Sequence, residues 1–353
     1  MADQPTLIDV SKRAGVSVAT VSRVLSGSAA VKSDKSARVL AAVESLNYRS
    51  LRNSTRGESK RPSREVGQVA VVLLGQDVLT NYSSDFAATL QAASEALSAA
   101  GRSMLIVNVK PGENIPEALL GDDLDGLLIA GSDADEAVIG QLPDRPVVWL
   151  TSHRGKNQNT AALAGNEYVG QLAADYLLEL GCRRLACLDI AAENPANETR
   201  RRFFAFTASQ AGVEVRQIDG LKTLPPDSDP EGWQKIEAAA RGMVDRLVAS
   251  GPTVDGLFVS NPLVLGPIYQ ALRSHGIEPE TDLRIITSGH HEPLLASLSP
   301  RPASIDLRGQ LIGRCAVQHL LSLIEKPEGS MPVDLMIRPT LQRPALDSLE
   351  GNR

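Results

Sequence analysis

The sequence predicts a small three-helix domain at the N-terminus, followed by a two-lobed α/β domain with two parallel, doubly wound sheets. Residues 6–46 carry short helical patterns with capping residues at their starts. From Val66 onward, apolar runs alternate with helix-like segments, which is typical of parallel strands covered on both faces. Two similar segments, DGLLIAG at 125 and DGLFVSN at 255, indicate two similar lobes. The length of 353 residues also fits more than one domain.

Residues 6–27 predict two short helices joined by a tight turn. The first helix is expected to begin at its N-cap, Thr6, and to end at Gly15, which supplies a left-handed residue. The second helix is expected to run from its cap, Ser17, to about Leu25. Two helices joined in this way form a helix-turn-helix, whose second helix enters the major groove of DNA.

The second helix carries the expected DNA-reading side chains. Val18 and Ala19 let the helix backbone approach the bases, and Arg23 can donate two hydrogen bonds to a guanine. Val21 and Val24 are expected to pack inward instead. An ordinary helical hairpin with a solvated polar face is the alternative explanation of this pattern.

A third helix is expected from Asp34 to about Leu46, with Ser33 as its cap, and it completes a headpiece of residues 1–48. Residues 49–65 contain almost no apolar side chain and six basic ones, so they are expected to form a linker. Four apolar residues of the third helix are expected to face the first two helices: Val39, Leu40, Val43 and Leu46.

The net charge of −6 conceals an asymmetry along the chain. Residues 1–65 hold 12 Lys and Arg against 6 Asp and Glu, whereas the rest holds 24 against 36. A basic head on an acidic body favours a head that binds a polyanion. Together with the helix-turn-helix pattern, this charge predicts double-stranded DNA as a partner.

The body, residues 66–344, shows the alternation of strands and helices expected for right-handed βαβ units. Its clearest helices are expected at 85–100, 167–180 and about 310–324. Its strands are expected at 66–74, 104–109, 125–130, 146–151, 184–190, 255–260, 283–287, 303–307 and 333–339.

Composition excludes several classes of protein. No apolar run reaches the roughly 18 to 20 residues that span a bilayer. The start MADQPTL has neither the basic residues nor the apolar core of a secretory signal, so a cytoplasmic protein is expected. Cys182, Cys187 and Cys315 lack metal-ligand spacing, and they are too few for a disulfide framework. We therefore expect no metal and no cofactor.

The run AGVSVATVSRVLSG, followed by a helix that ends in SLNYR, resembles the headpiece of the LacI/GalR (lactose-repressor) family. The body resembles the two-lobed domain that this family shares with periplasmic binding proteins. The resemblance implies a transcription regulator, most often a repressor, that binds a near-palindromic operator as a homodimer. It also implies that a small molecule, bound between the lobes, changes the affinity for the operator.

The resemblance assigns roles to individual headpiece residues. By this resemblance, the positions that read DNA bases are those of Val18, Ala19 and Arg23. Tyr48, at the end of the headpiece, is also expected at the DNA interface. Contacts to DNA phosphates fall on Thr6, Ser17, Thr20 and Ser22.

In the family the chain crosses three times between the lobes. The first lobe is therefore expected to contain about 66–163 and about 290–320, and the second about 164–289 and about 321–344. The tail, 345–353, is short and has no heptad pattern, so a tetramerising helix at this end is not expected, and dimer versus tetramer stays open.

The resemblance also predicts an effector site with two departures from the family pattern. Phe86, Arg202 and Asn261 match an aromatic, a basic and an amide residue of the family site. Thr151 and His290 stand where the family often has aspartates. Without those carboxylates, a site that keeps the Arg is rich in hydrogen-bond donors. An anionic or otherwise acceptor-rich effector is therefore expected.

The linker departs from the family as well. Its hinge helix, of the form YxPNxxAxxL, places a leucine in the minor groove of the operator. Counting from Tyr48, Gly57 takes the position of that leucine. We therefore expect operator binding without a leucine wedge and with more salt-sensitive contacts.

Three other functions can be compared with the sequence. No Walker loop, GxGxxG after a strand, HExxH or GxSxG occurs, so an enzyme is not expected. A transport protein with the same sensing fold would need export, which the N-terminus does not indicate. A DNA-binding regulator with a degenerate effector site, which is constitutive or controlled by a protein partner, stays the main alternative.

Overall fold

The chain divides into two compact units, Met1–Arg64 and Glu65–Arg353. The structure is a computed structural model. It describes residues 7–25, 33–45, 67–74, 84–110, 113–121, 123–131, 136–150, 160–225, 229–251, 253–326 and 331–344. The expected linker, 49–65, and the tail, 345–353, lie outside these residues.

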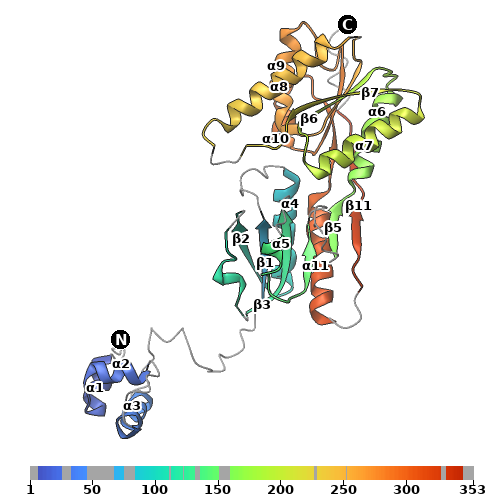
Figure 1. The fold of residues 1–353 in the computed structure, drawn as a ribbon. Coiled ribbons are helices and arrows are strands. Elements are labelled where there is room, and N and C mark those ends of the chain that lie inside the picture. Colours follow the sequence, from blue (N-terminus) through green and yellow to red (C-terminus); the bar gives the residue numbers. More distant parts are fainter. Residues whose placement is uncertain are drawn as a thin grey trace. The chain divides into compact units, whose positions relative to one another are not determined.

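The described residues of the N-terminal unit form three helices, as expected: α1 (Leu7–Ala14), α2 (Val18–Leu25) and α3 (Ser33–Ser45) (Figure 1). Gly15, between α1 and α2, has φ of +64°, the left-handed conformation predicted for it. The fully buried core of the unit comprises Val10, Ala14, Val21, Val39 and Ala42.

One prediction for α3 is wrong. Leu40 is 57% exposed, whereas Ala42 is 2% exposed. Positions i, i+3 and i+4 share a helix face, so Val39, Ala42 and Val43 form the inward stripe. Leu40 is turned by about 100° from Val39 and faces away from that stripe.

The first lobe of the body contains six parallel strands in the order β11-β5-β4-β3-β1-β2. Along β1, Val69 and Val71 pack on one face of the sheet, and Ala70 and Val72 pack on the other. The strands are β1 (Gln68–Leu74), β2 (Ser103–Val109), β3 (Leu124–Gly131), β4 (Val147–Trp149), β5 (Ala161–Ala164) and β11 (Asp334–Ile337).

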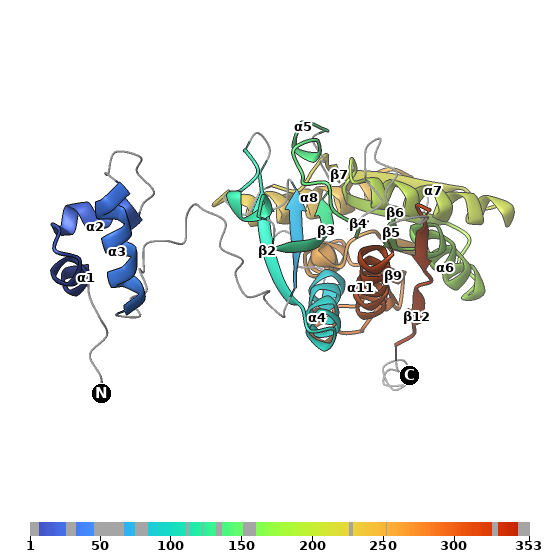
Figure 2. The same ribbon diagram turned by 90° about the horizontal axis from the view of Figure 1, so that it is seen from below.

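Helices cover both faces of this sheet. On one face α4 (Ser84–Ala99) and α11 (Gly309–Glu325) lie side by side (Figure 2). On the other face, α5 (Glu136–Ile139) and the short helix η1 (Glu117–Leu119) contribute to the core.

The second lobe repeats this plan in the order β12-β10-β9-β8-β6-β7, and among its described strands only β12 is antiparallel. Its strands are β6 (Leu185–Ala191), β7 (Val215–Leu221), β8 (Gly256–Val259), β9 (Arg284–Ser288), β10 (Ala303–Asp306) and β12 (Thr340–Gln342). Its helices are α6 (Asn166–Glu179), α7 (Pro195–Gln210), α8 (Gly232–Ala249), η2 (Pro262–Val264), α9 (Leu265–Ser274) and α10 (Glu292–Ala296).

The two sheets confirm the internal repeat, because β3 and β8, which carry the similar segments, occupy the same place in each order. The order reverses beside β1 in the first sheet and beside β6 in the second. Open α/β sheets bind ligands at such a reversal, outside the carboxyl ends of the strands.

The chain crosses between the lobes three times, as the resemblance implied: after β5, after β10 and after β11 (Figure 1). The expected allocation of the last two segments is wrong in part. β10, in segment 290–320, pairs with β9 in the second sheet, and β11, in segment 321–344, pairs with β5 in the first. β10 joins the second sheet before the chain crosses to the first lobe, and β11 joins the first sheet before the chain crosses back.

Glycines bring pairs of helices into backbone contact beside the lobe boundary. A Cβ atom at Gly309 of α11 would lie 2.0 Å from the carbonyl oxygen of Asp85 in α4. A Cβ at Gly170 of α6 would lie 2.2 Å from the carbonyl oxygen of Arg200 in α7. These contacts fix the helix turns that carry Asp85 and Arg200.

Candidate functional site

Two of the predicted DNA-binding residues form the cap at the N-terminus of α2. Ser17 Oγ accepts from Thr20 N at 3.2 Å and lies 2.9 Å from Thr20 Oγ1, which caps the helix. Val18 is 41% exposed on the same turn. The side chains of Ala19, Ser22 and Arg23, and residues Thr6 and Tyr48, lie outside the part of the chain that the structure describes.

Arg38 of α3 fixes the turn between the first two helices. Its Nη2 donates to Ala14 O at 2.7 Å and to Gly15 O at 3.3 Å. A cation at the carboxyl end of α1 satisfies carbonyls that the helix leaves unpaired. The sequence reasoning missed this residue, which sets the angle at which α2 leaves α1.

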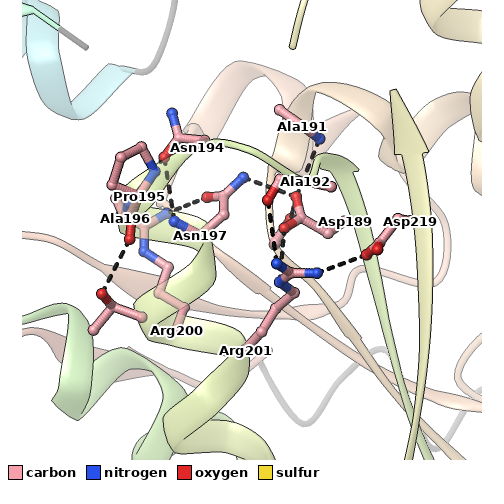
Figure 3. A network of polar contacts seen from close by, with 12 residues as sticks. Asp189, Ala191, Ala192, Asn194, Pro195, Ala196, Asn197, Arg200, Arg201 and Asp219 are labelled. Atoms are coloured by element: carbon pink, nitrogen blue, oxygen red, sulfur yellow. Dashed lines mark hydrogen bonds and ion pairs between the residues drawn. The ribbon is translucent and has the colours of Figure 1, made fainter. Parts of the chain in front are cut away.

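In the second lobe, Asp189 joins three elements at the place where the strand order reverses (Figure 3). Asp189 lies near the carboxyl end of β6 and is 0% exposed. Its Oδ1 accepts from Asn197 Nδ2 of α7 at 2.9 Å and from Ser260 Oγ, after β8, at 2.7 Å. Burial is the largest influence on Asp189 and raises its pKa, while these hydrogen bonds lower it.

Arg201 completes this network from α7 (Figure 3). Its Nε lies 3.2 Å from Asp189 Oδ2, and its Nη1 donates to Asp219 Oδ1 at 2.7 Å. Asn194 caps the same helix by accepting from the backbone N–H groups of Ala196 and Asn197. The N-terminal turn of α7 is therefore fixed to β6 and β7.

Arg200, the next residue toward the helix start, points to the lobe boundary. Its Nε donates to Asn166 Oδ1 at 2.8 Å, and its Nη1 donates to Ser288 Oγ at 3.1 Å. Burial lowers its pKa to about 10, while Asp85 and Asp189 act in the opposite direction. Arg200 therefore stays a cation at neutral pH and faces a carboxylate of the other lobe.

That carboxylate belongs to Asp85, in the first turn of α4, which is 8% exposed. Its Oδ2 is buried without a hydrogen-bond partner in the described residues, and a Cβ at Gly289 of the second lobe would lie 3.1 Å from it. Burial raises the pKa of Asp85 to about 6; Asp306 adds to the rise and Arg200 opposes it. The boundary thus combines a cationic donor with an anionic acceptor.

The predicted effector residues lie in different places in the structure. Phe86 is partly buried against the first-lobe core, next to Asp85. His290 lies at the boundary, with Nδ1 2.8 Å from Ser304 Oγ. Asn261 caps η2, its Oδ1 accepting from the N–H of the residue two positions on. Thr151 lies outside the described residues.

Arg202 is not brought together with the others. It is exposed, and its guanidinium lies over the ring of Phe203, 5.8 Å from the centroid. Two helix positions separate it from Arg200 by about 200°, so the two side chains point in opposite directions. The sequence signal that could have identified Arg200 was Phe204, four residues further along α7. Phe204 is fully buried, and positions i and i+4 share one face of a helix.

Sequence reasoning also missed Asp85, Asn166 and Ser288 as members of this cluster. In the described residues, no group of three or more His, Cys, Asp and Glu side chains could hold a metal ion. Over the same residues, every helix is too short or too polar to cross a membrane.

A helix-turn-helix unit and a two-lobed α/β body with a charged cluster at the lobe boundary define a ligand-responsive DNA-binding regulator. Residues 6–50 match the family described as "Bacterial regulatory proteins, lacI family". Residues 174–343 match the "Periplasmic binding protein-like domain".

Curated relatives identify the family. The HTH-type transcriptional regulator GntR of Pseudomonas aeruginosa is 30% identical over 336 residues, which cover 92% of this chain and 91% of that protein. The ribose operon repressor of Halalkalibacterium halodurans is 27% identical over 351 residues, 95% of this chain and 96% of that protein. The chain belongs to the lacI family of bacterial regulatory proteins.

Solved structures agree on the fold. A complex of the transcriptional regulator CelR with cellobiose superposes with a TM-score of 0.66 at 24% identity, covering 96% of this chain and 99% of that one. The lac repressor dimer bound to operator and an anti-inducer superposes with a TM-score of 0.65 at 18% identity, covering 97% of this chain and 99% of that one.

Proposed function

We propose that this regulator is a transcriptional repressor that binds a near-palindromic operator as a homodimer. The observation that carries the proposal is the capped, outward-facing start of α2 in a unit whose sequence matches the lacI family. Two copies of a headpiece read the two halves of a palindrome, and the dimer sets their spacing. A bacterial protein that acts on the chromosome works in the cytoplasm, and no catalytic role is needed for this function.

In this proposal the headpiece residues divide into two sets. Val18, Ala19 and Arg23 face base edges, where Arg23 gives a bidentate pair to a guanine. The phosphate and backbone contacts that position the helix come from Thr6, Ser17, Thr20, Ser22 and Tyr48.

The effector binds at the lobe boundary, and the charged cluster there suggests a neutral, hydroxylated molecule. The expectation of an anion rested on Arg202 without carboxylates, but Arg202 is exposed on another face of α7. At the boundary itself, Arg200 offers donors and Asp85 offers an acceptor. Sugar hydroxyls match both, because each donates and accepts.

The names of relatives agree with this class of effector. One curated relative is a ribose operon repressor, and solved relatives contain cellobiose or ribose. A regulator with a degenerate effector site is not favoured, because Arg200 keeps polar partners on two elements at the boundary.

The test begins with selection of genomic fragments by the purified protein, followed by affinity measurements on the best fragment. Arg23→Lys keeps the charge but loses the bidentate geometry. We expect it to weaken binding by about 1–3 kcal/mol and to relax the preference at one base pair. The slope of affinity against salt should stay the same, because counterion release follows charge.

A protein that binds all fragments equally and weakly would contradict the proposal. A screen of neutral sugars against their phosphorylated forms, by thermal shift, then tests the effector class on the same preparation.

A further inference from the structure

A fully buried carboxylate of the second lobe, that of Asp189, lies behind Arg200, the cation that faces the lobe boundary. Because Asp189 is 0% exposed, it touches no ligand itself. Three donors converge on its Oδ1, namely Ala191 N at 3.1 Å, Asn197 Nδ2 at 2.9 Å and Ser260 Oγ at 2.7 Å. Two of these donors begin hydrogen-bond chains that end at Arg200.

The first chain passes through Asn197 of α7, which lies between Asp189 and Arg200 (Figure 3). An ionised carboxylate only accepts hydrogen bonds, so Asp189 faces the NH2 group of the Asn197 amide. The amide oxygen then points the other way. It accepts a long hydrogen bond, 3.4 Å, from Nη1 of Arg200. Asp189 therefore determines that Asn197 presents an acceptor, and not a donor, to the guanidinium.

The second chain passes through Ser260 and Ser288, which are 0% and 1% exposed at the ends of the neighbouring strands β8 and β9. Ser260 donates its hydroxyl proton to Asp189, and its backbone oxygen accepts from Ser288 Oγ. A hydroxyl has one proton to donate, so Ser288 Oγ can only accept from Nη1 of Arg200, at 3.1 Å. Both chains thus place an acceptor on the same nitrogen.

In the described residues, the hydrogen bonds of Arg200 use Nη1 and Nε, and Nε donates to Asn166 at 2.8 Å. We propose that Asp189 is a positioning residue of the effector site: through the two chains it holds Nη1 of Arg200 and leaves Nη2 for the ligand. This inference rests on the proposed function, in which Arg200 donates to the effector. Asp189 acts by directing hydrogen bonds, and its charge alone is not sufficient.

Labelling of the full-length protein with phenylglyoxal, without ligand, tests this arrangement. The reagent closes a ring on both terminal nitrogens of a guanidinium, so hydrogen bonds to Nη1 protect Arg200. Fragment-ion mass spectrometry measures the rate at each arginine. Asp189→Ala removes the acceptor from which both chains begin, so labelling of Arg200 should accelerate about fivefold. Asp189→Asn keeps a carbonyl oxygen for the three donors and should stay within about twofold of the wild type.

Arg201 supplies the matched control, because it pairs with Asp189 at 3.2 Å and with the half-exposed Asp219 at 2.7 Å. Asp219→Asn weakens the hold on Arg201 and leaves both chains to Arg200 in place. Labelling of Arg200 should therefore stay within about twofold of the wild type in this variant. The exposed Arg202, on the same helix, gives the reference rate in every variant.

Unchanged labelling of Arg200 in Asp189→Ala would overturn the proposal. Equal acceleration in Asp189→Asn would also overturn it, because charge would then hold the guanidinium. Equal acceleration in Asp219→Asn would do the same, since it would show a general loosening of α7.

Should Asp189→Ala fail to fold, Asn197→Ala decides the matter. It breaks only the first chain, so labelling of Arg200 should accelerate about twofold or more, and no acceleration would contradict the proposal. The labelling needs no ligand, whereas the sugar affinity of Arg200→Ala tests the proposed function. Failure of the positioning role can therefore be told from failure of that function.

Discussion

At the scale of single residues, Asp85 combines burial with a charge, and this makes the stability of the protein depend on pH. Its pKa is raised from 3.8 to about 6, chiefly by burial. The native state therefore binds this proton more tightly than the unfolded chain does. The resulting stabilisation is complete below about pH 4 and is lost as the pH rises through about 6.

Asp85→Asn is neutral at every pH and removes this dependence. Relative to the wild type, its free energy of unfolding should rise by about 2.4 kcal/mol between pH 4 and pH 7. Urea denaturation at several pH values measures the difference, and Glu198→Gln, at an exposed position, serves as the control. A difference that stays constant with pH would show that Asp85 ionises as it does in the unfolded chain.

The residue scale also shows where sequence reasoning reached its limit. The inward stripe of the headpiece and the left-handed Gly15 were predicted, because periodicity and capping are local. Leu40 was assigned by its apolar character and Arg202 by its place in a motif, and both point away from the expected contacts. A strict helical period would have favoured Arg200, but Asp85 could not be found, since the second-lobe segment that it approaches, at Gly289, lies about 200 residues away in the chain.

At the scale of helices and strands, close packing depends on single glycines. A Cβ at Gly170 of α6 would lie 2.2 Å from Arg200 O and 2.7 Å from Phe204 N, which are backbone atoms of α7. The two helices must therefore separate to accept any side chain at this position.

Gly170→Ala should lower the free energy of unfolding by about 1–3 kcal/mol, the usual effect of overpacking. Gly266→Ala is the matched control, because Gly266 lies in α9 with no atom within 4 Å of its Cβ position. It should be neutral or stabilising by up to about 1 kcal/mol, since alanine favours helix over glycine. Chemical denaturation of both variants gives the comparison, and equal effects would refute the close contact of α6 with α7.

Burial of the strands explains which of them the sequence predicted. Continuous apolar runs predicted the central strands, such as β1, β3 and β6, because these are buried on both faces. The strand β7 escaped notice, since it lies at a sheet edge and mixes polar with apolar residues. The sheets that receive β10 and β11 follow from long-range pairing, which no local pattern records.

At the scale of the whole molecule, function requires that the two compact units exchange information. The effector unit, Glu65–Arg353, holds the charged cluster, whereas the helix-turn-helix lies in Met1–Arg64. If a ligand at the lobe boundary changes operator affinity by some factor, operator DNA must change ligand affinity by the same factor. This reciprocity distinguishes a coupled sensor from a DNA-binding protein that merely carries a sugar-binding body.

For a neutral sugar that binds in the thermal-shift screen, calorimetry with and without operator DNA should give dissociation constants that differ about 5- to 150-fold, the usual range of such coupling. Arg200→Ala should weaken sugar binding at least about tenfold and leave operator affinity in the absence of sugar close to the wild-type value, because only the boundary loses its donor. The matched variant Arg202→Ala removes the same charge from the exposed side of α7 and should change neither quantity by more than about twofold. If Arg202→Ala abolished binding and Arg200→Ala did not, the sequence motif would identify the effector residue better than the geometry does. Equal sugar affinity with and without operator would show that the body does not communicate with the DNA-binding unit.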